Sequence, residues 1–203
     1  MSAKPIKLVI NTHAHADHFG ANELMAQGGA VIIGHDALRE RMAKGQYLAA
    51  FNQTIPPSRP AALPTVTYAD AMTIHFDGET VELVHVPGAH TDNDTLVRFK
   101  RANVIHASGT IGGNGGYPFF DMSSGGSLAG TIAAEEKMLS LSDDKTRIVA
   151  DEGEPASAAE AIAAKPTQDL DARWAPRGGV LSGDVITRMA YQSLKGISLP
   201  ARR

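Results

Sequence analysis

The sequence has 203 residues, 43% of them hydrophobic, which favours one domain, residues 1–203, with a core of its own. Its formal net charge is -3 and its Lys and Arg residues are scattered, so no basic stripe is present that would bind nucleic acid. There is no Cys, which excludes disulfides and thiolate zinc clusters. Any metal must therefore be held by His, Asp, Glu or water.

The first residues of the sequence show no recognisable targeting signal. MSAKPIKLVI contains one apolar run, which is too short for the core of a signal peptide. No later segment approaches the length and apolarity of a membrane span. We therefore expect a soluble chain, cytoplasmic by default, whose native compartment the sequence leaves open.

Strands and helices are predicted to alternate in the first part of the chain. β-Branched runs predict strands at Ile6–Asn11 and Ala30–Gly34, and helices are expected at Gly20–Ala26 and Asp36–Lys44. The Pro-rich stretch Ile55–Pro64 fits neither regular structure. It is predicted to be a surface crossing or a lid over the site.

Antiparallel strands are predicted next. Met72–Val86 alternates apolar and polar residues around Asp77-Gly78, which is typical of a hairpin. Further short strands are expected at Thr95–Phe99, Val104–Ala107 and Thr146–Ala150.

The remaining elements are predicted to be helices. The SSGGS run supplies caps for a helix from about Leu128 to Leu141, whose apolar residues recur at helical spacing. An Ala-rich helix from about Ala156 to Ala164 and a second one at Val185–Leu194 would make residues 155–203 a C-terminal helical segment. Hairpin strands combined with strand-helix alternation predict an α/β fold in which helices cover a mixed sheet.

The stretch NTHAHADHFG, residues 11–20, holds three of the eight histidines of the chain. His13 and His15 are two residues apart, so in an extended segment they project to the same side and can share one ion. Asp17 and His18 follow where the chain turns into a helix, and they can hold a second ion or orient water. Clustered imidazoles beside a carboxylate gain little as a solvated loop, so the pattern indicates a metal site.

A third ligand for the first ion must come from another segment, because two imidazoles do not close a tetrahedral site. His90 is the best candidate, since Pro87 and Gly88 end a strand and turn the chain just before it. With His90 added, three ligands would leave a fourth position open for water, as in catalytic zinc sites. The other histidines are interpreted as structural or surface residues: His35, His75, His85 and His106.

The pattern HAHADH after an apolar strand, followed by PGAHTD, resembles the metallo-β-lactamase superfamily of hydrolases. The segments NVIHASGT, NGGYPFFD, SSGGS and AAKPTQDLDARW are similar to the subgroup associated with sulfur oxidation and quinoprotein relay. The resemblance implies an αββα sandwich with one or two ions, usually zinc, that activate water at one edge. It places His13, His15 and His90 in the first metal site. The second site would begin with Asp17 and His18, and Asp17 would orient the water and accept or relay its proton.

Three features depart from the family pattern. The family has several strands before the His motif, whereas ten residues precede Asn11 here, so the N-terminal strands of the sandwich are expected to be depleted. Gly109, in HASGT, stands where the family has an Asp that bridges two metals. In ADEGEP, Glu152 stands where a last metal-binding His is expected, which makes Asp151 or Glu152 the candidate substitute ligand.

Three functions are compatible with these residues. The first is a metal-dependent hydrolase that attacks an ester, thioester or lactam-type bond of a small-molecule substrate with metal-activated water, using one zinc ion or two. The second is a shortened, non-catalytic relative with a metal-binding or interaction role, or a gene fragment. The third is an Fe(II)-dependent oxygenase of the same fold, because imidazole and carboxylate ligands also suit iron. A depleted sheet further predicts a homodimer formed through its exposed edge.

Overall fold

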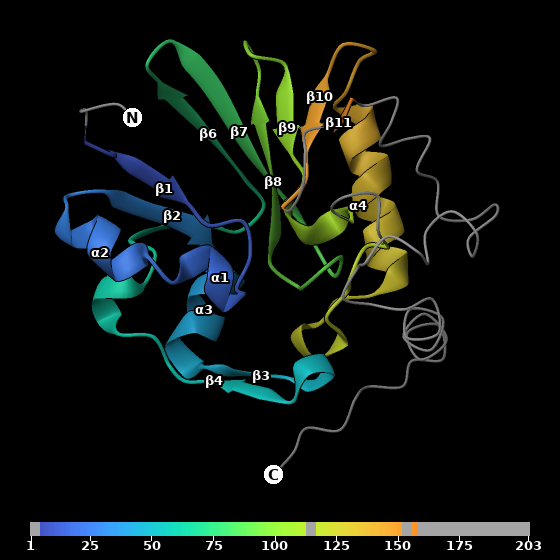
Figure 1. Cartoon of the computed structure of the whole chain (residues 1–203). Helices are drawn as coiled ribbons and strands as arrows, with labels where there is room; N and C mark the ends of the chain where they lie inside the picture. Colours follow the sequence, from blue (N-terminus) through green and yellow to red (C-terminus); the bar gives the residue numbers. More distant parts are fainter. Residues whose placement is uncertain (1–4, 113–116, 152–155, 158–203) are drawn as a thin grey trace.

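The structure of the protein is a computed structural model that describes residues 5–112, 117–151 and 156–157. Two β-sheets pack face to face, and helices lie on the outer side of each sheet (Figure 1). This is the α/β fold, an αββα sandwich of mixed sheets flanked by helices, that the family resemblance implied.

The small sheet has three parallel strands in the order β1-β2-β5. Their bounds are Leu8–Ile10 for β1, Val31–His35 for β2 and Val66–Tyr68 for β5. In the described residues β1 pairs with β2 alone, so the first strand forms a sheet edge, as the sequence predicted. A separate antiparallel hairpin joins β3 (Gln46–Leu48) to β4 (Gln53–Ile55).

The large sheet is mixed and has the strand order β11-β10-β9-β8-β7-β6 (Figure 1). Its strands are β6 Ala71–Phe76, β7 Glu79–Val86, β8 Asp94–Phe99, β9 Val104–His106, β10 Arg147–Val149 and β11 Ala156–Ser157. Asp77 and Gly78 both have positive φ, 50° and 75°, between β6 and β7. Two such residues match the twist of a tight hairpin, so the predicted β6–β7 hairpin is confirmed.

Four helices are described, and the two longest, α3 and α4, begin at side-chain caps. Their bounds are α1 Ala16–Phe19, α2 Asn22–Gln27, α3 Asp36–Lys44 and α4 Leu128–Ser140, with 3-10 turns η1 Ala49–Phe51, η2 Pro60–Ala62, η3 Ser108–Thr110 and η5 Met122–Ser124. His35 Nδ1 accepts a hydrogen bond from Ala37 N at the start of α3, and Ser127 Oγ accepts one from Gly130 N at the start of α4. No helix in this described part of the chain has both the length and the apolar composition needed to span a bilayer.

Three apolar clusters hold the layers together. The first lies between the two sheets and includes Ile33 of β2 and Leu83 of β7. The second packs α4 on the large sheet and includes Met138 and Leu96. The third lies under the small sheet, where Leu38 of α3 packs in one cluster with the end of α1. Removal of these side chains from water stabilises the stacking of the four layers.

The C-terminal prediction is wrong where the structure can test it. Ala156–Ser157 forms β11, an antiparallel partner of β10, where an Ala-rich helix was predicted to begin. Pairing with an open sheet edge overrides the helix propensity of alanine there. The rest of that predicted helix and the one at Val185–Leu194 lie outside the described residues.

The Pro-rich stretch contains more regular structure than predicted. Ile55 ends β4, and Pro60–Ala62 forms η2. Proline occupies the first position of that turn, where its fixed φ is suitable and its missing N–H is not needed. The stretch therefore crosses the surface as an ordered connection from β4 to β5.

Candidate metal centre

The histidine cluster lies in the loop after β1, which is held against the start of β8. Thr95 N donates to Thr12 O at 2.9 Å, and Ala14 N donates to Asn93 Oδ1 at 2.9 Å. The short helix α1 then turns the chain directly after His15. Two segments far apart in the sequence thus meet here: the loop after β1 and the loop between β7 and β8.

His13, His15 and His90 converge at this point. Each offers one nitrogen, and the three nitrogens all lie within 4.8 Å of one another. The rings are almost perpendicular, with centroids 4.5 to 4.8 Å apart, and all three side chains are buried. The three residues predicted to hold the first ion are therefore brought together.

Outer hydrogen bonds fix which nitrogen of each ring faces inward. His90 Nδ1 lies 2.5 Å from Phe119 O, and His15 Nε2 lies 3.2 Å from Asp121 Oδ2. A carbonyl oxygen and an ionised carboxylate can accept hydrogen bonds but cannot donate them. The outer nitrogens, His90 Nδ1 and His15 Nε2, therefore carry the protons. The inner nitrogens, His90 Nε2 and His15 Nδ1, are then both lone-pair donors, and they face each other at 2.9 Å. Two lone pairs at this distance need a shared cation or proton.

His13 completes the set. Its Nδ1 lies 3.2 Å from Thr12 Oγ1 and 3.3 Å from Ser108 Oγ. Its Nε2 is buried and has no hydrogen-bond partner among the described residues. A buried polar atom without a partner is costly, and a divalent cation would satisfy this one. The donor set therefore fits a metal ion.

The electrostatics also suit a metal. Burial, followed by the charges of neighbouring imidazoles, lowers the pKa of His13 well below its usual value. Burial, followed by the His15 charge, lowers the pKa of His90 to about 4. Both rings are therefore neutral near pH 7, which is the form that binds a metal.

A second group of donors lies beside the first. His13, His18 and Asp151 each place one donor atom within 4.8 Å of the others. Asp151 Oδ2 lies 3.7 Å from His13 Nδ1 and 3.9 Å from His18 Nε2. Asp151 Oδ1 lies 3.7 Å from His106 Nε2, so a histidine interpreted as structural borders this group.

The Asp17 side chain does not join either group of donors. Its Oδ2 lies 3.2 Å from His18 Nε2, but its side chain is 71% exposed, and neither group of clustered donors in the described ranges includes it. Glu152 lies outside the described residues. Asp151, the candidate substitute within the described residues, lies beside His13 and His18.

Asp121 was missed by the sequence reasoning. It follows β9 by many residues, in NGGYPFFD, and no spacing rule connects it to the His motif. The only available signal was that this segment carried part of the family resemblance. Its contact with His15 arises from the tertiary placement of η5.

Two of the remaining histidines have structural partners. His35 and His85 stack with ring centroids 3.7 Å apart. His35 Nε2 donates to Ala69 O at 2.6 Å, and His85 Nε2 donates to Asp92 O at 3.0 Å. These contacts tie β2 and β7 to neighbouring loops.

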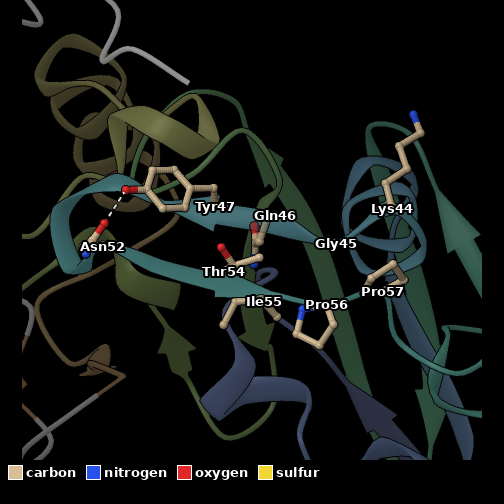
Figure 2. Close-up of a pocket in the computed structure, with 9 residues that line it drawn as sticks. All are labelled: Lys44, Gly45, Gln46, Tyr47, Asn52, Thr54, Ile55, Pro56 and Pro57. Atoms are coloured by element: carbon tan, nitrogen blue, oxygen red, sulfur yellow. Dashed lines mark hydrogen bonds between the residues drawn. The ribbon is translucent and has the colours of Figure 1, made fainter. Parts of the chain in front are cut away.

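A surface pocket lies beside the β3–β4 hairpin (Figure 2). It is lined by Lys44, Gly45, Gln46, Tyr47, Asn52, Thr54, Ile55, Pro56 and Pro57. Tyr47 Oη donates to Asn52 Oδ1 at 2.8 Å across the hairpin, and the two prolines belong to the predicted surface crossing (Figure 2). None of the clustered histidines lines this pocket, so it is separate from the candidate metal centre.

The sequence profile of the metallo-β-lactamase superfamily matches residues 1–145. A search of curated proteins finds no match. The fold is similar to that of a metallo-β-lactamase from Pontibacter korlensis, with a TM-score of 0.62 and 17% identity over 79% of this chain and 67% of that one. The BLEG-1 B3 metallo-β-lactamase gives a TM-score of 0.61 and 17% identity over 76% and 73% of the two chains.

A third similar structure is that of TTHA1623 in a di-iron-bound form. Its TM-score is 0.58, with 19% identity over 82% of this chain and 75% of that one. At such identities the structural likeness concerns the fold alone. The family and the histidine triad together support metal binding and leave the type of metal open. Because the profile covers most of the sequence, this chain belongs to the metallo-β-lactamase superfamily.

Proposed function

We propose that the chain is a metal-dependent hydrolase whose first ion, zinc, is held by His13, His15 and His90. The observation that carries this proposal is the convergence of three buried imidazoles, one of which has an inner nitrogen with no protein partner in the described residues. A zinc ion held by these residues would supply a water of lowered pKa and would polarise a carbonyl group. Three protein donors leave one position for water or substrate, which distinguishes a catalytic site from a structural one.

The residues beside the triad would handle protons and a second ion. Asp17 combines a solvent-exposed carboxylate with a 3.2 Å contact to His18, so it can exchange a proton between the site and bulk water. We assign it that relay role, together with a place in the second site. His18 and Asp151 would supply the clustered donors for a second, weaker ion.

An aromatic wall borders the triad and favours a substrate with an apolar group. The Phe119 ring lies 6.4 Å from His15 in a stacked orientation and 5.5 Å from His90. Phe51 of η1 packs edge-on against Phe119 at 5.4 Å and is 48% exposed. A small ester, thioester or lactam with an apolar substituent could place its carbonyl at the triad and the substituent on this wall.

Metal content and hydrolysis measured together test the proposal. The purified chain should hold about one tightly bound zinc, hydrolyse an activated aryl ester, a thioester or a chromogenic lactam, and lose activity with chelator until zinc is restored. His13→Ala should lose both metal and turnover. His75→Ala, which changes an exposed histidine of β6, should keep both. A folded chain that cannot be loaded with zinc would refute the proposal, and zinc uptake without turnover would favour the non-catalytic relative.

An iron-dependent oxygenase is the second candidate. A structural relative, TTHA1623, was solved with two iron ions, and histidine with carboxylate donors suits Fe(II) as well as zinc. Elemental analysis of protein made without added metal separates the two. Iron in the purified chain, with oxygen consumption in place of hydrolysis, would favour the oxygenase.

A further inference from the structure

Asp121 contacts a predicted metal ligand and has no role in the pattern that identified the site. It lies at the start of η5 with 1% of its surface exposed, and its Oδ2 lies 3.2 Å from His15 Nε2. We propose that Asp121 is a positioning residue that holds the His15 ring so that Nδ1 is presented to the metal. This inference rests on the proposed metal site formed by the histidine triad.

The carboxylate of Asp121 is itself held in place. Its Oδ1 accepts a hydrogen bond from Ser123 N at 3.0 Å and another from Ser123 Oγ. Ser123 Oγ in turn accepts a hydrogen bond from Ala49 N at 3.1 Å. With Oδ1 occupied in this way, Oδ2 has a fixed direction toward His15.

Asp121 also connects two ligands of the triad. Its backbone N donates to His90 O at 2.7 Å, while its side chain contacts His15. Phe119 O, two residues earlier, accepts from His90 Nδ1. The segment from Phe119 to Asp121 therefore fixes the ring of His90 and the ring of His15 relative to each other.

The Asp121 carboxylate is placed to act as a hydrogen-bond acceptor. Its Oδ1 accepts from Ser123, and its Oδ2 faces His15 Nε2 at 3.2 Å. An ionised carboxylate accepts the Nε2 proton of His15, fixes the tautomer and makes Nδ1 a stronger base. The outer nitrogen of His90 faces a carbonyl, and His13 Nδ1 faces two hydroxyls with the Asp151 carboxylate 3.7 Å away, whereas the Asp121 carboxylate lies 3.2 Å from His15 Nε2.

Zinc affinity of Asp121→Asn tests this role. Asparagine keeps the size of the side chain and can still cap η5, but it lacks the charge. In competition with a chromophoric chelator, the variant should bind zinc about 10- to 100-fold more weakly than the wild type. The Co(II)-loaded variant should also show an altered visible spectrum, which a purely structural cap would leave unchanged.

Asp143→Asn is the matched control. Asp143 also caps a turn, where its Oδ1 accepts from Lys145 N at 2.9 Å and from Thr146 Oγ1 at 3.0 Å. The Asp143→Asn variant should bind zinc as tightly as the wild type. If wild-type protein binds zinc and folded Asp121→Asn binds it equally well, the positioning role is wrong while the metal site stands. If wild-type protein binds no zinc, the metal site and this inference both fail.

A measurement on the unaltered protein covers the case in which Asp121→Asn does not fold. Long-range proton–nitrogen NMR of the zinc-loaded chain reports which nitrogen of each imidazole carries hydrogen. We expect His15 to carry its proton on Nε2, shifted downfield by the carboxylate, with Nδ1 bound to zinc. A His15 ring bound through Nε2 would overturn the inference.

Discussion

Gly109 lies against the imidazole ring of His90, so closely that a Cβ atom on Gly109 would stand 2.4 Å from His90 Cδ2 and 2.7 Å from Nε2. The family pattern expects a bridging Asp at this position, and the sequence showed only that no side chain is present. The structure adds a steric reason, because the His90 ring fills the space where a side chain would start. Glycine at 109 and the observed position of the His90 ring therefore depend on each other.

Restoring the family's carboxylate should consequently harm this site. Gly109→Asp must displace the His90 ring, and overpacking of this kind costs about 1 to 3 kcal/mol of stability. We expect a lower midpoint of thermal unfolding and weaker zinc binding at the triad, with Gly109→Ala showing a smaller effect of the same sign. A Gly109→Asp variant that binds a second zinc ion and keeps wild-type stability would contradict this steric account.

Removal of the Asp151 carboxylate should affect the second ion selectively. Asp151 faces His13 and His18 inside the protein, whereas the Asp17 side chain is 71% exposed. With excess zinc, Asp151→Asn should lose the weaker ion and keep the ion at the triad. Asp17→Asn should lose less of the second-ion affinity. Zinc titration monitored by calorimetry separates the two events, and equal stoichiometry for Asp151→Asn and wild type would argue against a role for Asp151.

The parts of the fold that could be predicted are those with strong local signals. Asp77-Gly78 specified a hairpin because both residues tolerate positive φ, and α3 was predicted over its full range. Two members of the triad, His13 and His15, were predicted to share one ion from their spacing of two residues, and their donor atoms converge although the chain bends at His13 and Ala14. In each case residues close together in the sequence determine the local structure.

The parts that could not be predicted depend on contacts between distant segments. The strands β3, β4, β5 and β11 were not predicted, and pairing with other segments defines them: β3 with β4, β5 with β2 and β11 with β10. Asp121 reaches His15 only because η5 packs beside the loop after β1. The positions of Asp121 and His15 in the sequence do not indicate that the two residues are close in the fold.

The metal-free protein should lose stability as the pH falls below neutrality. Burial lowers the pKa of His90 to about 4 in the folded chain, whereas an unfolded histidine titrates near 6.5. Between these values the unfolded chain binds more protons, so the free energy of unfolding decreases as pH falls, by about 3 kcal/mol for His90 alone. Urea unfolding of chelated protein from about pH 7 to about pH 4 measures this. His90→Gln should flatten the dependence, and an unchanged slope in that variant would exclude His90 as its source.

The ion pair between Arg41 and Asp92 should stabilise the loop that carries His90. Arg41 Nε and Nη2 donate to the two carboxylate oxygens of Asp92 at 2.8 and 2.5 Å, which joins α3 to this loop. Both side chains are partly exposed, so we expect Arg41→Gln to cost about 1 kcal/mol. Lys44→Gln, which removes an exposed pair with Glu40 on the same helix, should cost nothing measurable. If urea unfolding shows that the two variants lose the same free energy of unfolding, the bidentate geometry of the Arg41–Asp92 pair adds no stability.

The edge of the small sheet is expected to mediate dimerisation. Val31 N donates to Lys7 O and Asn11 N donates to Ile33 O, so by the alternation of a parallel ladder the odd-numbered residues of this segment face β2. The backbone groups of Leu8 and Ile10 therefore point away from β2, along the edge where another strand can add.

Sedimentation should give a dimer for the wild type and a monomer for Val9→Lys, because a charge on an edge strand opposes pairing. Thr67→Lys, on β5 at the opposite edge of the same sheet, should remain dimeric. A wild-type monomer at all concentrations would refute dimerisation through β1, and so would a Val9→Lys variant that stays dimeric.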